Sequence, residues 1–238
     1  MPSDPNIIRY IFKIGDDEAV QYDIDISYRL SGEVPEPNKD YPDWTLLDRN
    51  KCACCPLKSS EHRHCPAATR MHSVLEQFKG HGSIQELQLR VESSRRNFEV
   101  ACDLQSGLNS MLGLQMATSG CPIVGRLRSM ATFHVPYSSF AETLYRAVSG
   151  YLTKQYFIAR KGGEPDWELK GLQEFYTQLE TLNEDFSNRI QEIDQNDAIS
   201  NAMVMFFAAS VVVASLIEDG LAEYADYFTG VTTTPPAH

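Results

Sequence analysis

The 238-residue sequence has little positive charge and none of the common catalytic motifs. Lys and Arg number 21 against 32 Asp and Glu, which gives a formal net charge of -11. Such a surface repels polyanions, so nucleic-acid binding is not expected. The G-x-G-x-x-G, Walker, H-E-x-x-H and nucleophile-elbow patterns are all missing from the chain. The sequence therefore points to no specific reaction.

The chain also lacks a secretory signal and a long membrane-type segment. No basic stretch followed by an apolar one stands at the N-terminus, so a cytoplasmic location is expected. Cytoplasmic thiols stay reduced, and clustered cysteines there more often bind metal than form disulfides. The apolar run at residues 202–217 is shorter than the roughly 20 residues of a membrane span. It predicts a buried bundle or dimer helix and no membrane contact.

The first part of the chain carries patterns typical of β-strands. Residues 7–14 are apolar and β-prone, and residues 20–28 alternate between apolar and polar side chains. A second alternating pair, 87–91 and 98–102, indicates another hairpin. Residues 44–47 are expected to return to the sheet just before the cysteines. These segments predict a mainly antiparallel sheet.

From Leu104 onward the apolar period becomes helical. The predicted helices are one from about 104 to 118, a short one to about 131, one opened by a Ser139–Glu142 capping box, an apolar stripe over 172–193 and an apolar helix to about 228. A further helix is expected at 67–78. Strands followed by helices indicate an α+β fold.

We therefore divide the chain into an antiparallel sheet region with a Cys/His loop and a helical region packed on it or on a second copy. These are residues 1–104, with the loop at 52–65, and residues 105–230. The tail, residues 231–238, contains Pro-Pro and is expected to be disordered.

Cys52, Cys55, His62 and Cys65 form the pattern C-x-x-C-x6-H-x-x-C. Two cysteines separated by two residues can both turn their sulfurs toward one ion, and a second such pair completes a tetrahedron. Three sulfurs and one ring nitrogen are typical of a closed, structural zinc site. The sequence predicts that zinc binds at this loop.

The choice of ligands stays open in two places. Cys54 could replace Cys52 or Cys55, and His64 could replace His62. An iron–sulfur cluster is an alternative cofactor, because Cys54 or Cys121 could supply a fourth thiolate.

Cys121 is a second candidate for chemistry. It lies in Thr118-Ser-Gly-Cys-Pro122, where a helix is expected to begin, and a thiol at a helix N-terminus gains thiolate character. The alternative function is a redox or nucleophilic enzyme that uses Cys121, with His134 as its base. A buried small hydrophobic residue capping a helix is the favoured interpretation of Cys121. A third possibility is that Cys121 lies against the metal loop as an additional group.

The motifs Cys52-x-x-Cys55-Pro-Leu, His62-x-x-Cys65-Pro and Thr118-Ser-Gly-Cys-Pro122 resemble those of an uncharacterised bacterial domain family over roughly residues 7–160. The resemblance implies no activity or substrate, and it favours Cys52 over Cys54 as a ligand. The resulting expectation is a zinc-binding protein that acts by binding or self-association, and a binding protein is favoured over an enzyme. Its apolar C-terminal helices are expected to form a homodimer.

Overall fold

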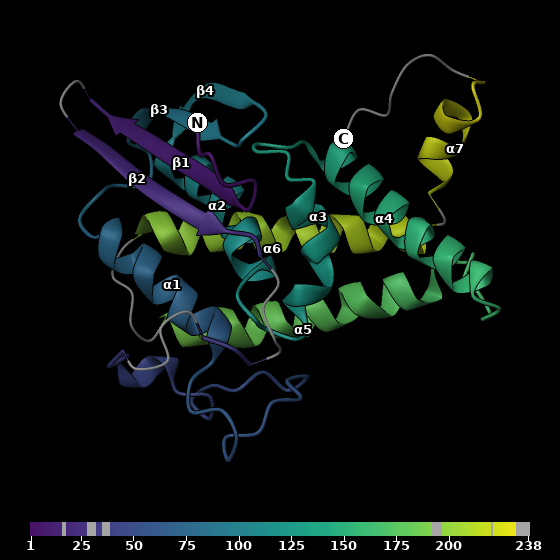
Figure 1. The fold of residues 1–238 in the computed structure, drawn as a ribbon, viewed down its shortest axis with the longest axis horizontal. Helices are drawn as coiled ribbons and strands as arrows, with labels where there is room; N and C mark the ends of the chain where they lie inside the picture. The colour runs from purple at the N-terminus through teal and green to yellow at the C-terminus, as the bar shows by residue number, and fades with distance from the viewer. Residues whose placement is uncertain (16–17, 28–31, 35–38, 192–196, 220, 232–238) are drawn as a thin grey trace. The chain divides into compact units, whose positions relative to one another are not determined.

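The computed structural model describes residues 1–15, 18–27, 32–34, 39–191, 197–219 and 221–231 (Figure 1). Two compact units are present, one made of residues 1–137 and 181–206 and the other of residues 138–180 and 207–238. This division follows spatial contacts, whereas the sequence division follows the change from strands to helices. Apart from Val231, the tail expected to be disordered lies outside the described residues, as does the end of the first predicted hairpin at Tyr28.

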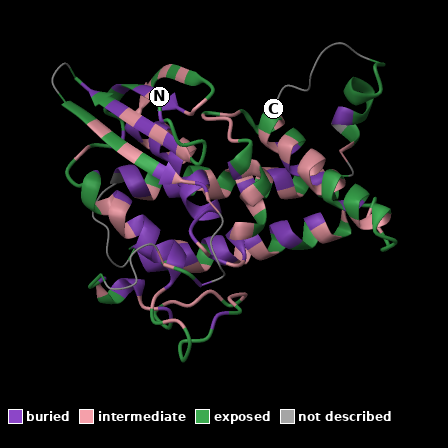
Figure 2. Ribbon diagram, viewed as in Figure 1, coloured by how far each residue is buried: buried purple, intermediate pink, exposed green. Residues whose placement is uncertain are grey.

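A four-stranded antiparallel sheet, in the order β2-β1-β3-β4, forms the first unit together with several helices. The strands are β1 (Ile7–Ile14), β2 (Glu18–Asp25), β3 (Glu86–Glu92) and β4 (Asn97–Asp103). Both predicted hairpins are confirmed, and β1 pairs with β3 to join them. Buried and more exposed residues alternate along β1 because successive side chains point to opposite faces (Figure 2).

Helix α2 (Leu104–Ala117) covers the buried face of the sheet. A methyl group at Gly107 would lie only 3.0 Å from Cε1 of Phe12, so the helix approaches the sheet very closely there. Tyr10 on β1 also donates a hydrogen bond to the Ser110 carbonyl of α2, at 3.1 Å. A sheet followed by helices is the α+β fold that the sequence predicts.

The segment before the cysteines differs from its prediction as a strand. Residues Asp43–Thr45 form the 3-10 helix η1, and only Leu46 makes an isolated bridge, to His64. The Thr45 N–H donates to the Pro42 carbonyl and the Leu46 N–H to the Asp43 carbonyl, so local turn hydrogen bonds take the place of strand pairing. The remaining short elements of this unit are α1 (Pro66–Gln77), η2 (Val124–Leu127) and α3 (Arg128–Thr132), close to the predicted helices.

Most helices that contribute to the second unit follow the predicted boundaries. The apolar helix predicted to run to about 228 is an exception: it is divided into two helices, because Leu221 has left-handed backbone angles with φ 58°. Ser139 caps α4 (Phe140–Arg160), and Glu142 reaches back to the Ser139 N–H, which confirms the capping box. Helices α5 (Lys170–Gln191) and α6 (Asp197–Glu218) each run through parts of both units, and α7 (Ala222–Phe228) follows them. The predicted break at 194–197 lies mostly outside the described residues.

Helix α6 is apolar without being enclosed on all sides. Among the described residues, Ala198–Glu218 is the one helix long and apolar enough to cross a membrane by length and composition, with a mean hydropathy of 2.0. Core helices of soluble proteins pass the same test, yet only 28% of its apolar window is buried. The sequence predicted a helix buried within a bundle or a dimer, and the chain by itself leaves much of this helix uncovered.

Candidate metal centre

The cysteine-rich loop is closed at its base by backbone hydrogen bonds. The Leu47 N–H donates to the Arg63 carbonyl at 2.9 Å, and the Cys65 N–H donates to the Thr45 carbonyl at 2.7 Å. Within the loop, the Cys55 N–H donates to the Cys52 carbonyl at 2.9 Å and makes a turn between the two cysteines. These contacts fix the ends of the loop and bring the first cysteine pair onto a single turn.

Arg189 on α5 holds the segment that leads into this loop. Its Nη1 donates to the carbonyl oxygens of Trp44 and Leu46 at 2.7 and 2.8 Å, and its Nη2 donates to those of Leu47 and Asn50 at 3.4 and 3.2 Å. The residue is only 1% exposed, and its Nε has no hydrogen-bond partner. One guanidinium group therefore fixes four carbonyl groups in the interior.

Sequence reasoning missed the roles of Arg189 and Asp185. Arg189 stands between the buried residues Phe186 and Ile190, so a charged residue interrupts the apolar stripe of α5. Asp185 accepts a hydrogen bond from the Ala53 N–H at 2.8 Å. A charge inside an otherwise apolar helix face is the sequence signal that could have identified Arg189, because such a charge needs buried polar partners.

Four thiols lie close to one another within the first unit. Burial raises the pKa of Cys52, and Cys65 and Cys121 raise it further. Burial also raises the pKa of Cys121 to about 12, with smaller contributions from Cys65 and Cys55. Thiols influence one another in this way only at short range in a poorly solvated region. The structure thus groups Cys121 with Cys52, Cys55 and Cys65.

Cys65 and Cys121 share the same local geometry. Each is followed by proline, and each begins a helical turn. The sulfur of Cys65 accepts hydrogen bonds from the backbone N–H groups of Ala67 and Ala68. The sulfur of Cys121 likewise accepts from Ile123 and Val124. Backbone N–H donors of this kind stabilise negative charge on a sulfur atom.

The two histidines of the loop have different surroundings. His64 Nδ1 lies 2.7 Å from Oγ1 of Thr45, and its ring lies 5.5 Å from that of Tyr41. The His62 ring lies directly against Gly32, where an added Cβ would be 2.3 Å from its Cε1. The Gly32 N–H in turn donates to the Gly120 carbonyl at 2.9 Å, which ties this turn to the residue before Cys121.

No preformed site for a metal ion is present in the described part of the chain. No group of three or more His, Cys, Asp or Glu side chains there is arranged so that it could hold an ion. The thiols affect the pKa of one another, but no three of the described ones are arranged to share an ion. Metal binding at Cys52, Cys55, His62 and Cys65 therefore stays a prediction.

The remaining cysteines lie apart from this group or at its edge. Burial raises the pKa of Cys102 to about 11, and Cys102 lies beside Gly107, between β4 and α2. Cys54 is half-buried. Burial raises the pKa of its thiol, and the negative charge of Asp185 raises it further. Cys102 is therefore a natural control for experiments on the other thiols.

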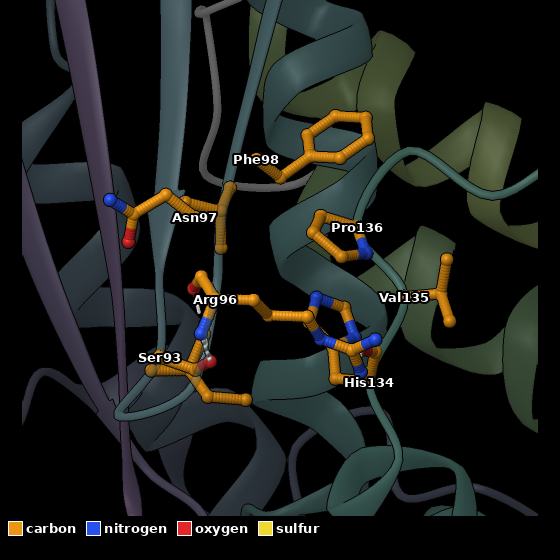
Figure 3. A pocket seen from close by; sticks show the side chains of 9 residues that line it. Ser93, Arg96, Asn97, Phe98, His134, Val135 and Pro136 are labelled. Carbon is orange, nitrogen blue, oxygen red and sulfur yellow. Dashed lines mark hydrogen bonds between the residues drawn. The ribbon is translucent and has the colours of Figure 1, made fainter. Parts of the chain in front are cut away.

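His134 belongs to a different part of the first unit. Its Nε2 lies 2.6 Å from the Tyr10 hydroxyl oxygen, and its carbonyl accepts a hydrogen bond from Arg96 at 3.3 Å. Figure 3 shows Arg96 and His134 side by side at a pocket of about 100 Å³ that Phe98 and Pro136 also line. This volume is well below the roughly 300–1,000 Å³ of typical ligand pockets. His134 contacts Tyr10 and Arg96, whereas burial and neighbouring thiols raise the pKa of Cys121.

Comparison with known proteins gives one match. The model of a family described as a domain of unknown function, DUF6901, matches residues 8–229. No curated protein and no solved structure matches the chain. The resemblance to an uncharacterised domain family is thereby confirmed, and the match adds no activity or ligand.

Proposed function

The chain belongs to the DUF6901 family, and we propose that it holds a structural zinc ion at its cysteine-rich loop and acts by binding or self-association. The observation that supports this is the grouping of Cys52, Cys55 and Cys65 around a loop that is closed at its base. With His62, these residues supply the three sulfurs and one nitrogen of a structural zinc site.

Metal binding would supply the loop with stability that packing does not. Between η1 and α1 the chain has no regular secondary structure. A structural zinc ion contributes folding free energy directly, because its ligands are brought together only in the folded chain. Pro56 and Pro66 directly follow two of the proposed ligands and restrict the unfolded backbone. The cytoplasm, the proposed location, keeps the thiols reduced for binding.

The thiol-enzyme alternative has no support of this kind. A nucleophilic cysteine needs a lowered pKa and a base within reach. Burial instead raises the pKa of Cys121 to about 12, and His134 contacts Tyr10. Cys121 is better explained as a partner of the neighbouring thiols.

Elemental analysis of the purified full-length chain tests the metal proposal. We expect about one bound zinc per chain, and we expect Cys52→Ser and Cys65→Ser to lose it with a lowered melting temperature. Cys102→Ser, the matched control, should keep the metal because it lies away from the group. A wild-type chain that is purified without chelators and contains no metal would refute the proposal.

Self-association is proposed to use the uncovered side of α6. Val204 is 62% exposed and Val211 is 51% exposed, and they are two turns apart on one helix. Residues of this type rarely stay in water as a continuous stripe unless a partner covers them. A second copy of the chain, paired through its C-terminal helices, would do so.

Light scattering coupled to size-exclusion chromatography tests the proposed homodimer. The wild-type chain should have twice the monomer mass of 26.8 kDa, and Val204→Glu with Val211→Glu should reduce it to the monomer mass. Lys154→Glu, an exposed change on α4, should leave the dimer intact. A wild-type monomer at micromolar concentration would contradict the dimer and leave the metal proposal unaffected.

A further inference from the structure

We propose that Cys121 takes the place of His62 as the fourth ligand, so that the metal centre is made of sulfur alone: Cys52, Cys55, Cys65 and Cys121. This inference rests on the metal site proposed above and changes its chemistry. It joins the cysteine loop to the turn after α2, about 55 residues further along the chain.

The positions of the thiols carry the first step. The Gly32 N–H donates to the carbonyl of Gly120, the residue before Cys121, and the ring of the loop residue His62 lies against Gly32. The turn that carries Cys121 is therefore held at the cysteine loop, and burial, Cys65 and Cys121 all raise the pKa of Cys52. Cys65 and Cys121 are both buried. Two segments far apart in the sequence, one with Cys52, Cys55 and Cys65 and one with Cys121, therefore lie against each other. The proposed loop ligands alone come from a single segment.

The matching turns after Cys65 and Cys121 carry the second step. In both places, the sulfur of a Cys-Pro sequence accepts backbone N–H groups from the second and third following residues. Hydrogen bonds to sulfur are typical of thiolates that bind metal, because they offset the charge that the metal does not neutralise. His62 does not share this arrangement: its ring lies against Gly32.

Arg189 supplies the third, independent observation. Its guanidinium is almost fully buried, its Nε has no partner, and its Nη1 and Nη2 donate to four backbone carbonyl groups. A buried cation that forms no ion pair among the described residues is costly. The charge of Arg189 acts on Cys65. Four thiolates around Zn²⁺ carry two net negative charges, one more than three thiolates and a histidine, so the all-sulfur centre offsets Arg189 better.

The spacing of the thiols leaves two forms of this centre to be distinguished. Sulfurs bound to one zinc ion are about 3.8 Å apart, since each Zn–S bond is about 2.3 Å in a tetrahedron. No described group has the arrangement that one ion requires. Binding would thus draw the four sulfurs together around zinc, or the four thiolates would hold a four-iron cluster, whose ligand sulfurs lie further apart. The shared chemistry is coordination by four thiolates.

X-ray absorption spectroscopy of the wild-type holoprotein provides a test that needs no variant. Four sulfur ligands around zinc, or four sulfurs with an iron–iron distance and acid-labile sulfide, would support the inference. Three sulfurs and one nitrogen would overturn it while leaving the proposed zinc site standing. Protein purified both aerobically and under anaerobic conditions, and free of metal in each case, would remove both proposals.

Variants supply the second readout. Cys121→Ser should lose the bound metal to the same extent as Cys52→Ser, and His62→Ala should keep the wild-type content. Cys102→Ser should also keep it. Circular dichroism identifies any variant that fails to fold. If a variant does not fold, the X-ray absorption spectrum of the wild-type protein determines the ligand set. Retention of metal by folded Cys121→Ser, with loss in folded His62→Ala, would overturn the inference.

Discussion

Nη1 of Arg189 donates to the carbonyl oxygen of Trp44 at 2.7 Å across a separation of 145 residues. This contact fixes the segment leading into the cysteine loop against α5, deep in the first unit. The loop therefore depends on a helix that follows it by more than half the chain. The region proposed to bind metal is a tertiary feature and would not form in a short peptide.

Arg189→Met should destabilise the first unit strongly. The change removes hydrogen bonds to four carbonyl groups, and each group left buried without a partner costs about 1–3 kcal/mol. Because the groups share one donor, we expect a total of about 3–5 kcal/mol, measured by urea unfolding. Arg160→Met, at an exposed position on α4, should change stability by less than about 0.5 kcal/mol. If Arg189→Met and Arg160→Met lower the free energy of unfolding by similar amounts, the role assigned to Arg189 is contradicted.

Gly32→Ala should destabilise the chain more than Gly15→Ala. Both glycines have positive φ, +82° and +70°, so both variants carry the backbone strain of about 1 kcal/mol. Only at Gly32 would the new methyl group meet another residue, since it would lie 2.3 Å from His62 Cε1. When His62→Ala is combined with Gly32→Ala, the extra destabilisation at Gly32 relative to Gly15 should disappear. A double-mutant cycle of unfolding free energies measures this effect. Equal losses at the two glycines would show that the His62 ring moves aside freely.

Asp166 gives the second unit a defined pH dependence. The Gly171 N–H, 2.8 Å from Oδ2, is the main cause of its lowered pKa, and burial opposes that shift while Tyr151 adds to it. A carboxyl group with a lowered pKa stabilises the folded chain above its unfolded pKa of about 3.9, and the stabilisation is lost as pH falls through the lower folded value.

Asp166→Ala should accordingly lower the melting temperature at pH 7, and the difference from wild type should shrink as pH falls below about 4. Glu164→Gln is the matched control, because Glu164 is exposed and close in sequence. Thermal unfolding followed by circular dichroism between pH 2 and 7, in steps of about one unit, measures both. A constant difference over this range would show that Asp166 acts without its charge.

Removing the metal should expose the proposed ligand thiols. After treatment with a chelator, alkylation of Cys65 and Cys121 should become faster together, because the centre that orders both segments is lost. Cys102, between β4 and α2, should react at an unchanged rate. Mass spectrometry of the alkylated peptides gives the three rates separately. If the chelator changes none of them, no bound metal orders these cysteines.

The sequence predicted most of the fold because its local patterns were unambiguous. The β-prone run of β1, the alternation along β2 and the capping box at Ser139 depend on near neighbours, and all three are present as expected. Residues 44–47 were misjudged because an apolar run of that length fits a strand or a buried loop equally well. The pairing of β1 with β3 joins segments about 80 residues apart, and no local pattern encodes it.

For the candidate site, the sequence by itself determined which residues could bind metal, since thiols and imidazoles at short spacing are a chemical property of the chain. It could not determine which of them meet. The nearness of Cys121 to Cys65, the position of the His62 ring on Gly32 and the burial of Arg189 beneath Trp44 all depend on segments far apart in the chain. Only packing in the folded protein brings such segments together, because burying apolar surface stabilises contacts that sequence spacing does not specify.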